Sequence, residues 1–178
     1  MTVGALSLPL SSVLTGQPEV IGHSVLAAAA ASISFQFPSV YRAVLVEAYI
    51  KRDANAGAVW MRLNGDSGNN YSYQYISATS TTVAGARATA QAQWLLDVTS
   101  TIDANSYQSF SALVMKTTAA AKAQLVDVSS YDPAASIGLE LTGGEWGNTA
   151  DLMSRLDVLS ASNNFAAGTS ISLWGFRY

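Results

Sequence analysis

The chain has 178 residues, a net charge of −3 and only 12% charged residues, whereas 49% of its residues are hydrophobic. This length is typical of one domain that buries a sizeable core. The few Lys and Arg residues are scattered, which argues against a nucleic-acid-binding surface because such a surface concentrates positive charge. Because there is no cysteine, disulfides and thiolate metal sites are excluded.

No segment of the sequence predicts membrane insertion or secretion. The longest uninterrupted apolar run, residues 25–31, is much shorter than a membrane-spanning helix. The first basic residue is Arg42, so the N-terminus lacks the positive segment that begins a secretory signal peptide. We therefore expect a protein that is made in the cytoplasm and is not exported by the Sec route.

The low charged fraction has two explanations, because an ordinary domain carries about twice as much charge. Neutral Ser, Thr, Asn and Gln side chains could cover the surface, or part of the surface could be buried against other subunits. The sequence is rich in such neutral residues. Of the two, we favour an oligomer.

Residues 1–31 are expected to form a short irregular N-terminal arm that precedes one domain over residues 32–178. A run of alanines at residues 27–31 lacks the length and amphipathic spacing of a stable helix. An arm that crosses the domain or reaches a neighbouring subunit fits this composition. The arm residues expected at such an interface are Pro9, Pro18, Val20, Ile21, Val25 and Leu26.

From residue 32 onward, short segments with alternating apolar residues predict about ten β-strands. The first, residues 32–37, stops at Pro38, which cannot donate a hydrogen bond to a central strand. Residues 77–85, rich in Ser, Thr and Ala, are expected to be a loop. The other strands are expected at residues 44–51, 59–63, 71–76, 91–98, 110–117, 123–128, 137–141, 152–159 and 169–178. This rhythm predicts an all-β sandwich or barrel.

Two motifs resemble a β-sandwich module of tailed-phage virion proteins. One is the strand at residues 59–63 that runs into NGDSGNNY at residues 64–71, and the other is FAAGTSISLWGFRY at residues 165–178. Residues 33–44, an apolar strand, a Pro-containing turn and a Tyr-basic pair, add to the resemblance. It implies a jelly-roll-like antiparallel β-sandwich, and it supplies no catalytic residues.

The module occurs in tail-fibre and receptor-binding proteins and in capsid-attached structural proteins. Tail-fibre versions usually carry it at the end of a longer chain with trimerising segments, whereas here it makes up nearly the whole sequence. This departure favours a capsid decoration (cement) protein, a homotrimer that binds the major capsid protein on the outside of the assembled shell. The alternative is a tail-fibre or receptor-binding module that recognises a host-surface glycan or protein.

Tyr71, Tyr73 and Tyr75 alternate along one predicted strand and therefore share one of its faces. Tyrosine combines apolar area with a polar tip, which suits a seam between subunits or a glycan-binding face. The same three rings could equally line the inner face of the sandwich. We expect that they contribute to an interface, together with the exposed aromatic candidate Trp60.

His23 is the only histidine, so the chain cannot build a metal site from several histidines. A catalytic triad would need a serine and a carboxylate beside it, and we expect a surface or interface histidine instead. The turn at residues 64–70 offers oxygen ligands for Ca²⁺ but lacks the spacing of an EF-hand. Because turns favour the same residue types, we expect a turn without an ion.

Paired carboxylates would be the signature of a glycan hydrolase. Glu145-Trp146, within a Gly-rich segment, could hold a sugar ring, or the tryptophan could pack on the edge of the sandwich. The acids that cluster late in the sequence are Glu140, Glu145, Asp151 and Asp157. We expect no enzymatic activity, no cofactor and no metal, and a protein that is made in the host cytoplasm and used in the virion.

Overall fold

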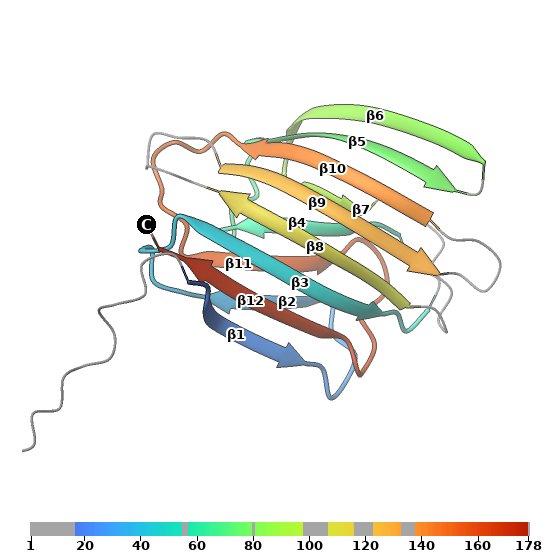
Figure 1. Cartoon of the computed structure of the whole chain (residues 1–178), viewed down its shortest axis with the longest axis horizontal. Coiled ribbons are helices and arrows are strands. Elements are labelled where there is room, and N and C mark those ends of the chain that lie inside the picture. Colours follow the sequence, from blue (N-terminus) through green and yellow to red (C-terminus); the bar gives the residue numbers. More distant parts are fainter. Residues whose placement is uncertain are drawn as a thin grey trace, which may run out of the picture.

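The computed structural model describes residues 17–54, 57–79, 81–97, 107–115, 123–132 and 138–177. They form twelve strands in two antiparallel sheets that pack against each other, so the predicted all-β antiparallel sandwich is confirmed (Figure 1). The described residues contain no helix that is long and apolar enough to cross a membrane.

The larger sheet has eight strands in the order β1, β12, β3, β8, β9, β10, β5, β6. Their bounds are β1 Glu19–Val25, β12 Ser170–Phe176, β3 Ala43–Lys51, β8 Tyr107–Met115, β9 Ala123–Asp132, β10 Gly138–Trp146, β5 Tyr71–Thr79 and β6 Thr82–Gln91. The smaller sheet has four strands in the order β2, β11, β4, β7. Their bounds are β2 Ser32–Gln36, β11 Arg155–Ser160, β4 Val59–Leu63 and β7 Trp94–Asp97.

Eight of the strands pair in a nested order. β1 pairs with β12 and β2 with β11, while β3 lies between β12 and β8, and β4 lies between β11 and β7. Two further strand pairs are inserted into this pattern, β5 and β6 after β4, and β9 and β10 after β8. These four strands, which we call the wing, extend the larger sheet on the side away from β1 (Figure 1).

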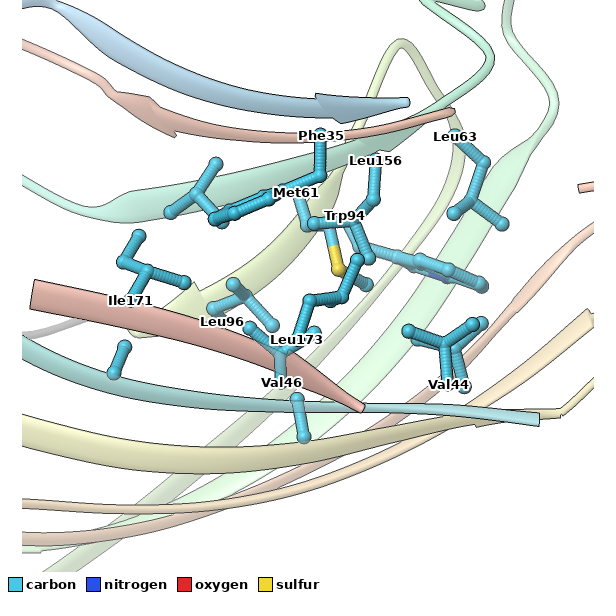
Figure 2. Packing of buried hydrophobic residues seen from close by; sticks show 14 of the residues in the cluster. Phe35, Val44, Val46, Met61, Leu63, Trp94, Leu96, Leu156, Ile171 and Leu173 are labelled. Carbon is cyan, nitrogen blue, oxygen red and sulfur yellow. The ribbon is translucent and has the colours of Figure 1, made fainter. Parts of the chain in front are cut away.

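The core lies between the two sheets and follows the period of two along each strand. On β3, for example, Val44, Val46 and Ile50 are fully buried, whereas Glu47 and Tyr49 face outward. Figure 2 shows the labelled core side chains that meet across the sandwich, with Phe35, Met61 and Leu156 on one side and Val46, Ile171 and Leu173 on the other. Each fully buried aliphatic side chain stabilises the fold by about 1.5–3 kcal/mol.

The structure differs from the sequence-based expectation at the expected arm. Residues 19–25 form β1, which pairs with β12 in the larger sheet, so this part of the arm is a strand of the sandwich. Its alternation was obscured because β1 lies at a sheet edge and only Ile21 and Leu26, just after it, pack against the core. Pro9 lies outside the described residues, as does the rest of residues 1–16.

The expected loop at residues 77–85 is wrong, because β5 continues to Thr79 and β6 begins at Thr82. β6 reads TVAGARATAQ, and most of its residues are exposed on both faces. A strand without a buried face has no reason to alternate apolar and polar residues, so periodicity could not detect it. With β1 and β6 the described residues form twelve strands instead of the expected ten or so.

Candidate functional site

The outer face of the larger sheet, which points away from the smaller sheet, has a polar half and an apolar half. The polar half lies on β12, β3 and β8 and contains a shallow hollow of about 410 Å³, which we call the serine groove. The residues that line it are Glu47, Ala48, Tyr49, Ser109, Phe110, Ser111, Ser170 and Ser172. Four serines therefore surround one carboxylate and one tyrosine ring.

The register of the strands creates this arrangement. Residues that lie opposite each other in antiparallel strands share a face, and their side chains are neighbours. One row across the sheet consists of His23, Ser172, Glu47 and Ser111, from β1, β12, β3 and β8. The adjacent row places Ser170 and Ser109 on either side of Tyr49.

Neighbouring side chains hold the polar groups of the groove in place. The Trp174 indole Nε1 donates a hydrogen bond to Glu47 Oε2 at 3.0 Å, and His23 Nδ1 is hydrogen-bonded to Ser172 Oγ at 2.9 Å. The Tyr49 ring stacks on the Tyr107 ring with centroids 4.6 Å apart and an angle of 19° between the planes. The ring and the carboxylate are thus oriented before any ligand arrives.

Serine, histidine and carboxylate meet here, but in the wrong order for a catalytic triad. In a triad the histidine lies between the nucleophilic serine and the carboxylate, which orients the imidazole. Here Ser172 lies between His23 and Glu47 in the row across the sheet, and Glu47 is held by the Trp174 indole. The geometry therefore favours binding of a polar molecule over activation of a serine nucleophile.

The apolar half of the outer face lies on the wing. β10 and β5 are neighbours, with Leu139 opposite Ala78 and Leu141 opposite Ile76, and Val83 follows on β6. Exposed side chains form this apolar stripe: Ile76, Val83, Leu139 and Leu141. Val83 is 70% exposed, although a valine gains free energy from burial. A stripe of this kind marks a surface that another molecule can cover.

The predicted interface tyrosines occupy two different environments. Tyr71 is fully buried, with its ring 5.4 Å from that of Trp94 and 6.5 Å from that of Trp146. Burial raises the pKa of the Tyr71 hydroxyl well above its ordinary value. Tyr71 thus belongs to the core, whereas Tyr73 and Tyr75 are half-buried on the inner face of the wing.

Trp60 is half-buried and contacts Tyr73, with ring centroids 6.1 Å apart. The arm residues that the structure describes also fall into two groups, one packed against the core and one exposed. Ile21 and Leu26 pack against the core, whereas Pro18, Val20 and Val25 are exposed. The exposed arm residues lie on or next to β1, whereas the half-buried Tyr73 and Tyr75 lie on β5, and these two strands are far apart in the order of the larger sheet.

Glu145 and Trp146 do not form a joint sugar site. They are consecutive residues of β10, so their side chains point to opposite faces of the sheet. Trp146 is fully buried, and its Nε1 donates to Asp66 Oδ2 at 2.7 Å. The Gly-rich segment is therefore the second half of a strand.

The other late acids are separated by the fold and engaged in local contacts. Glu140 is buried on β10 and accepts a hydrogen bond from Thr142 Oγ1 at 3.1 Å. Asp157 lies on β11 of the smaller sheet and pairs with Arg155 at 2.8 Å. Asp151 accepts a hydrogen bond from Asn148. Among the described residues, no group of three or more His, Asp or Glu side chains is arranged to hold a metal ion.

The segment at residues 64–70 is a turn whose carboxylate already has donors. Asn64 and Gly65 adopt φ angles of 53° and 67°, which Asn and Gly tolerate better than other residues. Asp66 accepts hydrogen bonds from the Gly68 N–H, the Asn70 side chain and the Trp146 indole. Burial alone would raise the pKa of Asp66, but these donors outweigh it and hold the pKa below its ordinary value. Donors that converge on the carboxylate are the pattern of a turn rather than of a cation site.

Comparisons of this chain with protein-family models, with curated proteins and with solved structures find no match. The functional inference therefore rests on the sequence motifs, on the two halves of the outer face and on the edges of the larger sheet.

Proposed function

We propose that the chain is a non-enzymatic structural protein of a phage virion, a capsid decoration (cement) protein that binds the outside of the assembled shell as a homotrimer. The motifs at residues 64–71 and 165–178 support the virion origin through their resemblance to the phage module. The nested pairing of β1 with β12 and of β2 with β11 fits the jelly roll which that resemblance implies.

One observation supports an oligomer: exposed apolar side chains lie at both open edges of the larger sheet. β6 is ten residues long, has Arg87 as its one charged side chain, and pairs only with β5 among the described strands. β1 pairs only with β12 among them, and its Val20 and Val25 are 62% and 57% exposed. Long strand edges with few charges attract further strands unless a partner covers them, and β6 and β1 each carry one charged side chain, Arg87 and Glu19.

Because the two edges differ, they suit a head-to-tail contact in which β6 of one copy meets β1 of the next. Contacts of this kind close into rings when the rotation between copies allows it. The apolar stripe on the wing lies beside β6 and would be covered by the same neighbouring copy. The exposed arm residues Pro18, Val20 and Val25 would then lie at this seam.

Lysine substitutions at the two edges test this contact. Val83→Lys on β6 and Val20→Lys on β1 are each expected to convert the trimer into monomers, because either change places a charge in the seam. Light scattering coupled to size-exclusion chromatography measures the mass. Val40→Lys is the matched control, since Val40 is 52% exposed but lies in the turn between β2 and β3. A wild-type monomer, or variants that remain trimeric, would contradict the head-to-tail seam.

The role on the shell is tested by the copy number of the protein in purified particles. A cement protein stabilises the shell by mass action, because many copies bind the assembled shell but not its dissociated subunits. We therefore expect a copy number close to that of the major capsid protein, measured by quantitative mass spectrometry. A few copies per particle would place the protein on the tail, and its absence from the particle would refute the proposal.

The second candidate is a receptor-binding module of the tail that recognises a host-surface glycan. The serine groove favours it, because an exposed tyrosine ring and a carboxylate lie side by side in a polar hollow. A small number of copies per particle together with adsorption to host cells would support this candidate over the cement protein.

A further inference from the structure

We propose that the serine groove on β3, β8 and β12 binds one neutral sugar ring. This inference does not depend on the trimer or on the shell, and it supplies a site for the receptor-binding alternative. It rests on three properties of the groove: a fixed aromatic ring, hydroxyl groups on both sides of it, and a single oriented carboxylate.

The aromatic ring is that of Tyr49. It lines the groove and is 47% exposed, so nearly half of its surface is available to a ligand. Tyr107 stacks against it at 4.6 Å, and Lys51 Nζ lies 5.8 Å from the centre of the Tyr107 ring. This support fixes the orientation of Tyr49, so little entropy is lost when a ligand packs on it. The C–H face of a pyranose is the kind of surface that such a ring can cover.

The polar atoms match the rim of a sugar. Ser170 and Ser172 lie on one side of the β3 residues, and Ser109 and Ser111 lie on the other side. A serine hydroxyl both donates and accepts, as a sugar hydroxyl does. The Glu47 carboxylate is a pure acceptor with two oxygens, and hydrogen bonds to an ionised acceptor are the stronger ones. The Trp174 indole occupies one side of Oε2 and holds the carboxylate in place.

The charge of the groove selects against acidic sugars. Glu47 is the only charged residue among those that line it. A uronic or sialic acid carboxylate would therefore meet a like charge without a cation in the lining. A neutral hexose or N-acetylhexosamine has no such conflict.

A peptide is a poorer fit than a sugar. Extended peptides bind sheets by pairing with a free strand edge. The backbone of β3 is paired on both sides, with β12 and β8, and β12 is paired with β1. The groove thus offers no unpaired strand edge, and a ligand must be recognised through side chains.

A panel of neutral sugars tests the proposal on the full chain. Glucose, galactose, mannose, N-acetylglucosamine and their trisaccharides are titrated by isothermal calorimetry, with sialyllactose as the acidic comparison. We expect one neutral sugar series to bind. Tyr49→Ala and Glu47→Gln are each expected to weaken its binding roughly tenfold or more, since each removes a contact worth at least 1.4 kcal/mol. Tyr49→Phe retains the ring and is expected to stay within about threefold of wild type.

The matched controls lie outside the groove on the same sheet. Tyr75→Ala removes a half-buried tyrosine of β5, and Glu145→Gln neutralises a half-buried carboxylate of β10. Both are expected to bind as wild type does. Unchanged thermal unfolding of Glu47→Gln and Tyr49→Phe shows that these variants are folded.

Tryptophan fluorescence gives an independent readout. Because the Trp174 indole is bonded to Glu47, a sugar on Glu47 is expected to change the tryptophan emission, and Trp174→Phe is expected to remove that change and to weaken binding, because Glu47 loses the donor that holds it. Absence of binding across the panel would overturn the proposal. So would binding that Tyr49→Ala leaves unchanged, or preferential binding of sialyllactose. None of these results bears on the copy number in the particle, which tests the proposed shell role separately.

Discussion

Replacing Trp94 with alanine is expected to lower the free energy of unfolding by about 4 kcal/mol, the largest effect of any single substitution considered for this chain. Trp94 is fully buried at the start of β7, the edge strand of the smaller sheet. Its ring packs edge-on against that of Tyr71, with centroids 5.4 Å apart. β7 also contacts β5 and β10, so the cavity would open between the smaller sheet and the wing.

Chemical denaturation monitored by circular dichroism measures this change. Trp94→Phe separates ring packing from the polar indole, because Trp94 Nε1 has no hydrogen-bond partner among the described residues. The phenylalanine keeps an aromatic ring against Tyr71 and removes that unpaired donor. We therefore expect the free energy of unfolding to fall by only about 1–2 kcal/mol. Trp60→Ala, at a half-buried tryptophan of β4, is the matched control and is expected to cost about 1 kcal/mol. If Trp94→Ala and Trp60→Ala lowered the free energy of unfolding equally, β7 would not anchor the wing.

Replacing Gly144 with alanine is expected to destabilise the protein by about 3 kcal/mol through overpacking. A Cβ atom at this position of β10 would lie 2.6 Å from the Ser72 carbonyl oxygen and 2.8 Å from Trp94 Nε1. The nearer of the two is a backbone atom of the neighbouring strand, which cannot rotate away. A methyl group there would therefore force β10 and β5 apart in the part of the wing that packs against β7.

Gly143→Ala is the control for this effect. Gly143 is the preceding residue of β10, points to the opposite face and is exposed, so we expect a change within about 0.5 kcal/mol. The double variant Trp94→Phe with Gly144→Ala tests which contact dominates. Because the Ser72 oxygen remains in place, most of the Gly144→Ala penalty should persist in the Trp94→Phe background. If Trp94→Phe removed the whole destabilisation caused by Gly144→Ala, the indole and not the strand backbone would limit the space at this position.

The strands that could be predicted from the sequence are those with one buried and one exposed face. β2, β3, β4 and β12 alternate apolar and polar residues because the core lies on one side only. β6 was missed because both of its faces are exposed, and the second half of β10 was missed because Gly143 and Gly144 resemble a loop. In both places the strand exists because β5 provides a partner, and that pairing is a tertiary property.

The candidate site was only partly visible in the sequence. None of the groove residues was predicted from the sequence, although the alternation of serine with apolar residues at positions 109–112 and 170–173 is a signal that could have placed these serines on an outer face. That these two segments flank Glu47 and Tyr49 follows from the order β12, β3, β8, which no local pattern encodes. The tyrosine row shows the same limit. Its shared face was predicted, but the burial of Tyr71 depends on Trp94 and Trp146, which come from distant parts of the chain.

The nested pairing also constrains how the chain folds during synthesis. β12 lies between β1 and β3, and β11 lies between β2 and β4, so late strands occupy interior positions in both sheets. While the ribosome is still making residues 155–176, β1 and β2 have no strand to pair with. The wing, built from strands that are closer in sequence, can form its hairpins earlier. Contacts between distant residues form slowly, so the sandwich is completed only when its last strands have been made. Until then the apolar faces of β1 and β2 stay uncovered in the nascent chain.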